Sequence, residues 1–236
     1  MRIARWLGFG AGVAVAAYGT YVGATWLQYG RRKRADSRKE ADELLDRFMP
    51  EYEIAERHRV NVAAPADITF STACAMDLQD SAMVRAIFKA RELLLCAQPQ
   101  PGTPPRGLLA QTKAMGWTVL AQIPGREIVM GAITEPWKGI PVFRGVAPDE
   151  FASFREPGHV KIAWTLRADP IGEERSVFHT ETRAVCTDAE ARVKFRRYWA
   201  FLSPGIILIR RLSLGPLKKA AEGRACPTPT FRWQQP

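Results

Sequence analysis

The sequence has few of the residues that bind metals or cross-link small folds. Its four cysteines, Cys74, Cys96, Cys186 and Cys226, lie no closer together than about twenty positions, and its three histidines show no metal-ligand spacing. Zinc sites need closely spaced cysteine or histidine pairs, so we predict no metal and no cofactor. Disulfide scaffolds are shorter and richer in cysteine, which favours free thiols in a reducing compartment.

Recognisable catalytic signatures are also missing. The chain contains no Ser-His-Asp or Cys-His set, no phosphate-binding Walker loop and no HExxH motif. Gly8, Gly10 and Gly12 do not form a dinucleotide-binding fingerprint, because the third spacing is wrong and no strand precedes them. These absences favour a binding function over an enzyme.

Positive charge, in contrast, is in excess. The 236 residues include 34 Lys and Arg against 24 Asp and Glu, which gives a net charge of +10, and 47% of the residues are hydrophobic. This composition suits one medium domain with a core and excludes a disordered chain. No aromatic-interleaved or helix-turn-helix pattern accompanies the basic residues of the C-terminal region, so we expect them to contact anionic lipid headgroups and expect no nucleic-acid partner.

An uncharged segment runs from Trp6 to Gly30. As a helix, its central twenty-one residues would extend about 31 Å, which is the thickness of a bilayer core. Two basic residues precede the segment and six follow it, so the positive-inside rule places the C-terminal domain in the cytoplasm. We predict an N-terminal transmembrane helix over about residues 6–29, within an anchor of residues 1–35. The predicted membrane-surface residues are Arg31, Arg32, Lys33 and Arg34.

A cleaved signal peptide is the alternative interpretation of this segment. Ala14-Val15-Ala16 could serve as a cleavage site. The apolar run continues past Ala16 and ends in a basic cluster that resists translocation, which favours an uncleaved anchor. The pairs Gly8/Gly12 and Gly19/Gly23 would let two such helices approach closely, so the segment could form a homodimer.

The remaining residues alternate between strand-like and helix-like patterns. We predict an amphipathic linker helix over 36–50, a domain over 51–220 and a flexible tail over 221–236. Within the domain the expected strands are 52–62, 117–123, 126–134, 141–146, 159–169 and 175–187. The turns Pro124-Gly125 and Pro170-Ile171-Gly172 predict two hairpins. The expected helices are 66–76, 82–95, 108–115 and a long basic helix that Asp188 caps, that meets Pro204-Gly205 and that resumes through Leu217. This order predicts an α+β helix-grip fold, in which a curved antiparallel sheet wraps around the C-terminal helix.

Four stretches in this order resemble the START-like, or SRPBCC, superfamily, which includes polyketide cyclase-like proteins. They are VNVAAPADITFSTACAMDL (60–78), GREIVMGAITEPW (125–137), residues 151–188 with Glu-Thr-Arg at 181–183, and RRYWAFLSPG (196–205). The resemblance covers roughly residues 50–220, excludes the apolar N-terminal segment, and is to small bacterial members. It implies a helix-grip fold with a pocket for a hydrophobic small molecule or lipid between the sheet and the C-terminal helix. Together with the predicted anchor, we expect a protein of a bacterial inner (cytoplasmic) membrane.

The alternating strands suggest which side chains line such a cavity. Apolar residues on one face of the sheet, together with aromatic residues of the terminal helix, are the best candidates. The predicted lining residues are Met130, Ile162, Trp164, Leu166, Tyr198 and Trp199.

Charged residues within the strands leave two other functions open. Glu56 and His58 share the apolar face of their strand, so a cyclase- or hydrolase-like enzyme could use them as weak catalytic candidates. Glu181 and Arg183 fall on the charged face of their own strand, which should point away from the core. An outward or helix-docking ion pair is expected there. The third alternative is a non-catalytic interaction protein with a filled core.

Overall fold

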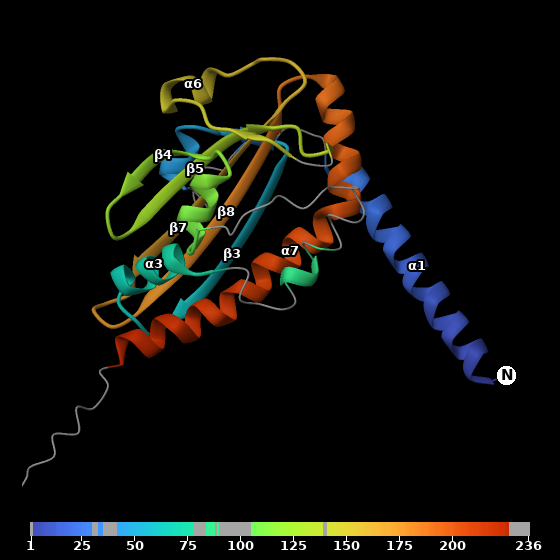
Figure 1. Cartoon of the computed structure of the whole chain (residues 1–236), viewed down its shortest axis with the longest axis horizontal. Coiled ribbons are helices and arrows are strands. Elements are labelled where there is room, and N and C mark those ends of the chain that lie inside the picture. The colour runs from blue at the N-terminus through green and yellow to red at the C-terminus, as the bar shows by residue number, and fades with distance from the viewer. Residues whose placement is uncertain are drawn as a thin grey trace, which may run out of the picture.

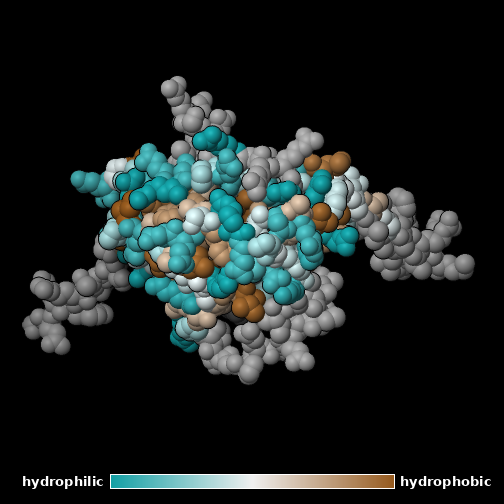
Figure 2. Space-filling model, turned by 90° about the horizontal axis from the view of Figure 1, so that it is seen from above, coloured by the Kyte–Doolittle hydropathy of each residue, from teal (hydrophilic) through white to brown (hydrophobic). Residues whose placement is uncertain are grey.

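The computed structural model describes residues 2–29, 33–34, 42–77, 84–87, 89, 105–138 and 141–226. A long helix, α1 (Arg2–Gln28), extends away from a body in which an antiparallel sheet packs on a second long helix, α7 (Ala189–Ala225) (Figure 1). Seen from above, the surface is mainly hydrophilic, with hydrophobic residues in separate patches (Figure 2).

The sheet confirms the strand pattern predicted from alternation. Its strands run in the order β3-β8-β7-β5-β4, with β6 paired to β5. Gly125 and Gly172 adopt positive φ values of 71° and 87°, which glycine tolerates, and they close the two predicted hairpins. The strand bounds are β3 (Ile54–Val62), β4 (Thr118–Ile123), β5 (Glu127–Thr134), β6 (Phe143–Arg144), β7 (Val160–Pro170) and β8 (Ser176–Cys186).

Helix α7 is continuous, whereas the sequence predicted an interruption at Pro204. Both Pro204 and Pro216 lie inside the helix, and Figure 1 shows that α7 bends along its length. A proline removes one backbone hydrogen bond and clashes with the preceding turn, which bends a helix whose two halves are held by packing. Trp199 before the bend and Leu217 after it are both buried, so each half is held.

The concave face of the sheet is filled from both ends. Helices α3 (Ala66–Ala75) and α5 (Leu108–Ala114) pack there with the second half of α7. Near the first half of α7, Phe195 and Trp199 pack against Ile54, Val160 and Ala184. This arrangement is the helix grip that the sequence predicted.

The convex face carries elements that the sequence did not predict. Strand β1 (Lys33–Arg34) pairs with β2 (Glu51–Tyr52), and α6 (Pro148–Ser153) follows β6.

Of the linker helix predicted over 36–50, residues 42–50 are described, and only α2 (Glu43–Asp46) is helical among them. Arg31 and Arg32 lie outside the described residues, as does most of the helix predicted over 82–95, of which 84–87 and 89 are helical.

Replacing Asp188 by alanine is expected to lower the free energy of unfolding by about 1 kcal/mol. Asp188 Oδ1 accepts a hydrogen bond from Ala191 N at 2.8 Å, and Oδ2 accepts one from Gly158 N. The substitution removes the acceptor of the Ala191 N–H at the α7 N-terminus and of the Gly158 N–H in the neighbouring turn. Chemical denaturation of the full chain in detergent measures the loss. Glu190→Ala on the exposed first turn is the control, and an equal loss there would contradict the capping role.

Candidate functional site

The four predicted lining residues of the sheet face α7, and together with the two that belong to α7 they fall into two different clusters. Three are buried in the core against α3 and the second half of α7, where Met130 and Trp164 are cross-strand partners. The other three pack around Phe195 near the first half of α7. The first set is Met130, Trp164 and Leu166, and the second is Ile162, Tyr198 and Trp199.

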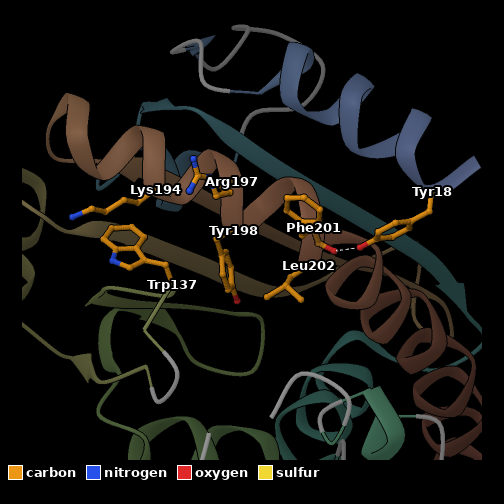
Figure 3. A pocket seen from close by; sticks show the side chains of 7 residues that line it. All are labelled: Tyr18, Trp137, Lys194, Arg197, Tyr198, Phe201 and Leu202. Carbon is orange, nitrogen blue, oxygen red and sulfur yellow. Dashed lines mark hydrogen bonds between the residues drawn. The ribbon is translucent and has the colours of Figure 1, made fainter. Parts of the chain in front are cut away.

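A pocket of about 580 Å³ lies along the first half of α7 (Figure 3). Its walls are mainly aromatic and aliphatic, and two cations stand at one end. It is lined by Tyr18, Trp137, Lys194, Arg197, Tyr198, Phe201 and Leu202. Of these, Tyr198 was predicted. Trp137 follows β5 in a loop and Tyr18 comes from α1, so strand periodicity could not indicate them.

The two cations differ in their partners. Lys194 Nζ lies 2.7 Å from Glu190 Oε1 and 5.9 Å from the centre of the Trp137 ring. The hydrogen bond that Lys194 donates to Glu190 raises the pKa of Lys194, so it stays an ammonium ion. Arg197 is exposed and makes no ion pair with any residue that the structure describes. The pocket therefore offers a positive charge beside an apolar surface.

The C-terminal third of α1 forms part of this site. Tyr18 donates a hydrogen bond to the carbonyl of Phe201, and the hydroxyls of Tyr21 and Ser203 are 2.9 Å apart. Arg196 donates to the carbonyl of Trp26 and lies 4.5 Å from the centre of its ring. These contacts join a segment predicted as a membrane anchor directly to α7.

Glu56 and His58 lie on the concave face, as the alternation predicted. They are opposite Thr182 and Thr180 of β8. Arg210 of α7 reaches toward them, with its Nη1 3.5 Å from Thr180 Oγ1. Burial lowers the pKa of Arg210 to about 10, against the opposing effect of the Glu56 carboxylate.

The surroundings shift both candidate catalytic groups toward their neutral forms. Burial raises the pKa of Glu56, although the Tyr29 hydroxyl donates to its Oε1 at 3.2 Å. Burial, followed by Arg210 and Arg211, lowers the pKa of His58. The buried Nε2 of His58 has no hydrogen-bond partner among the residues that the structure describes. A neutral imidazole beside a carboxyl group with a raised pKa is suited to acid-base chemistry.

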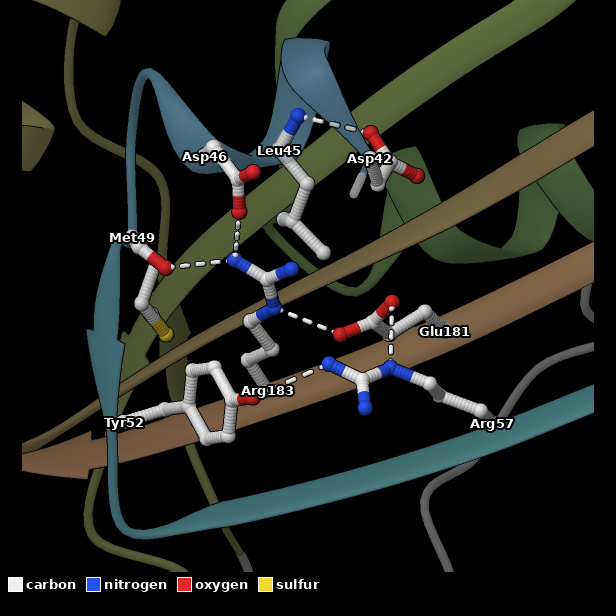
Figure 4. A network of polar contacts seen from close by, with 8 residues as sticks. All are labelled: Asp42, Leu45, Asp46, Met49, Tyr52, Arg57, Glu181 and Arg183. Carbon is white, nitrogen blue, oxygen red and sulfur yellow. Dashed lines mark hydrogen bonds and ion pairs between the residues drawn. The ribbon is translucent and has the colours of Figure 1, made fainter. Parts of the chain in front are cut away.

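Glu181 and Arg183 lie on the convex face and form a buried network (Figure 4). Arg183 Nε donates to Glu181 Oε1 at 2.5 Å, and Nη1 donates to Asp46 and, at 2.8 Å, to the carbonyl of Met49. Glu181 also pairs with Arg57 at 2.9 Å. The predicted helix-docking ion pair is thus present, and it fixes the segment around α2 to the sheet.

The described residues contain no group of three or more His, Cys, Asp or Glu side chains arranged to hold a metal ion. Among the described helices, α7 has the length and apolar composition of a span, but it packs on the sheet as a core helix. Helix α1 covers the predicted span as one unbroken helix, and its location in a membrane stays a prediction.

Comparison with known proteins gives distant structural similarities only. No protein-family profile and no curated protein sequence matches the chain. A point mutant of norcoclaurine synthase from Thalictrum flavum is 11% identical, over 73% of this chain and 96% of that one, with a TM-score of 0.34. The Zhui aromatase/cyclase from Streptomyces sp. R1128 is 15% identical, over 74% and 96%, with a TM-score of 0.26.

CalU16 from Micromonospora echinospora is a third similar structure, 13% identical over 83% of this chain and 96% of that one, with a TM-score of 0.26. At these values the fold assignment rests on the chain's own topology. The antiparallel sheet, the helix after its first strand and the long C-terminal helix across its face are those of the START-like helix-grip fold predicted from the sequence.

Proposed function

We propose that this chain binds or carries a hydrophobic small molecule or lipid in the pocket beside α7. The observation that carries the proposal is the pocket of about 580 Å³ with aromatic and aliphatic walls. That volume is in the range of small-molecule sites, which are mostly apolar and use a few polar groups to orient the ligand. Arg197 and Lys194 supply those groups, so the ligand class is an amphipathic molecule with one anionic group.

We further propose that α1 holds this site at a membrane, with the domain on the cytoplasmic side of a bacterial inner membrane. The uncharged composition of residues 6–30 and the unbroken helix over Arg2–Gln28 support an anchor. Gly19 and Gly23 have open space where a Cβ atom would lie, which supports close approach of a second α1.

Replacing Leu202 by tryptophan is expected to weaken binding of a fluorescent fatty acid by about tenfold, because the indole occupies the pocket. The full chain in a non-ionic detergent is titrated with the probe. Leu212→Trp, an exposed position on the same helix outside the pocket, is the matched control and should bind normally. Arg197→Gln should weaken binding of the acid but not of its methyl ester.

Equal affinity of the Leu202 and Leu212 variants would contradict the pocket assignment. Native mass spectrometry of the full chain gives an independent measurement, since a carrier should retain a lipid-sized adduct. A chain that retains no adduct and binds no probe would instead favour the non-catalytic interaction protein.

The second candidate function is a cyclase- or hydrolase-like reaction at Glu56 and His58. The observation that favours it is the buried Nε2 of His58, which has no partner in the described part of the chain, because a buried polar atom usually has a partner. Hydrolysis of a nitrophenyl ester by the full chain would test it. Unchanged turnover in both His58→Ala and Glu56→Gln would exclude this chemistry.

A further inference from the structure

Helix α7 carries an apolar stripe that faces away from the sheet. Phe201, Leu208 and Leu212 are 51%, 42% and 37% exposed. Their spacing of seven and then four positions places them on one side of the helix. We call these three residues the α7 stripe. Arg197 and Arg211, both exposed, lie beside it. An exposed apolar row beside basic residues is typical of helices that lie at the surface of an anionic bilayer.

The contacts of α1 give this stripe its position relative to a membrane. Among the described residues, Tyr18 is the first residue of α1 with a side-chain hydrogen bond to α7. Residues 6–17, the uncharged part before it, are twelve residues and extend about 18 Å at the rise of an α-helix. A bilayer core is about 30 Å thick. The part of α1 that precedes Tyr18 is therefore too short to cross it.

A docked α1 that enters a bilayer must take part of α7 with it. Tyr18, Tyr21 and Trp26 contact α7 over the turns that contain Arg196, the Phe201 carbonyl and Ser203. The α7 stripe begins on those turns. Because a crossing needs more of α1 than residues 6–17, Tyr18 would enter the bilayer and bring Phe201 at least to the level of the headgroups.

We propose that the α7 stripe lies in the headgroup region of an anionic bilayer beside α1, so that the pocket opens onto lipid. Phe201 and Tyr18 belong to the pocket wall, and a ligand would therefore enter from the adjacent leaflet. Arg197 and Arg211 would contact lipid phosphates, which selects an anionic lipid surface over an uncharged protein groove as the partner. The inference rests on the proposed membrane insertion of α1, but not on the identity of the ligand.

Fluorescent labels on a single accessible cysteine test this placement in the full chain, with the native Cys186 left in place because it is buried. The background carries Cys74→Ala, Cys96→Ser and Cys226→Ser, and an environment-sensitive dye is attached to Leu208→Cys or Leu212→Cys. The matched control is Ile123→Cys, an exposed position at the end of β4, in the hairpin away from α1 (Figure 1). The proteins are reconstituted into vesicles of phosphatidylcholine and phosphatidylglycerol, and acrylamide is added as an aqueous quencher.

We expect acrylamide quenching at positions 208 and 212 to be severalfold weaker than at position 123. Omitting phosphatidylglycerol should restore much of the quenching, and unchanged protection would overturn the assignment of an anionic surface. A label on Gly12→Cys reports α1 alone. Protection at position 12 with full quenching at 208 and 212 would overturn this inference and leave the anchor intact. Full quenching at position 12 as well would overturn both.

Discussion

Replacing Arg183 by methionine is expected to lower the free energy of unfolding by about 3 kcal/mol. The guanidinium is fully buried, so every charge-assisted hydrogen bond that it makes is sheltered from water. Methionine fills a similar volume but leaves the Met49 carbonyl and the Asp46 carboxylate without this donor. Glu181 keeps its ion pair with Arg57, which limits the loss. Chemical denaturation of the full chain in detergent measures the effect.

A surface arginine provides the matched control for this substitution. Arg144 pairs with Glu156 at 2.5 Å, but the two side chains are 48% and 52% exposed. Exposed ion pairs contribute at most about 1 kcal/mol, so Arg144→Met should change stability little. An equal loss in the free energy of unfolding of the two variants would contradict the claim that burial strengthens the Arg183 network.

The network also has a consequence for the position of α1. Arg183 ties Asp46 and Met49 to the convex face, while Tyr21 and Trp26 tie α1 to α7. The chain between the two attachments includes β1, which pairs with β2. The start of the domain is thus fixed on both sides of the sheet. Loss of Arg183 should therefore expose the segment around α2 to proteolysis before the sheet itself unfolds.

Local sequence patterns predicted the sheet and the faces of its strands. Strict alternation placed Glu56 and His58 on the concave face, and glycine-containing turns placed both hairpins. Such signals depend only on neighbouring residues. The pocket depends on contacts between distant segments, since Tyr18 and Phe201 are 183 positions apart. No local period in the sequence contains that information.

Proline was the clearest misleading signal. Pro204 predicted an interruption of the terminal helix, because a proline lacks the donor that a helix interior needs. The helix continues because Trp199 and Leu217 bury large side chains on either side of it. That packing outweighs the cost of about 3 kcal/mol for one proline in a helix. Tertiary contacts therefore allow α7 to continue through Pro204 to Ala225.

Glu127 is an acidic residue in an unusual position on the convex face. It is buried on β5, and no described residue forms a hydrogen bond with its Oε1. Burial, and then the charge of Asp42, raises the pKa of Glu127 to about 8, with Arg167 opposing and Asp169 adding to the shift. Asp42 is itself buried and caps α2 by accepting from Leu45 N at 2.8 Å. The folded chain therefore favours a protonated Glu127.

Wild-type stability is consequently expected to fall as the pH rises from about 5 to about 8. A carboxyl group whose pKa is higher in the folded than in the unfolded state stabilises the fold fully below its unfolded pKa. That contribution is lost as the pH rises through the folded pKa of about 8. The loss should be about 2 kcal/mol, less than the whole shift would give, because solvent and Arg167 screen the carboxylate.

Glu127→Gln should abolish this fall, because the amide keeps the shape of the protonated acid and carries no charge at any of these pH values. Unfolding of the full chain is measured at pH 5, 6, 7 and 8 for both proteins, with the variant expected to be the more stable at pH 8. Glu150→Gln, in the first turn of α6, is an exposed control and should follow the wild type. A parallel fall in the Glu127 variant would place the titrating group elsewhere, with Glu56, whose pKa burial also raises, the next residue to replace.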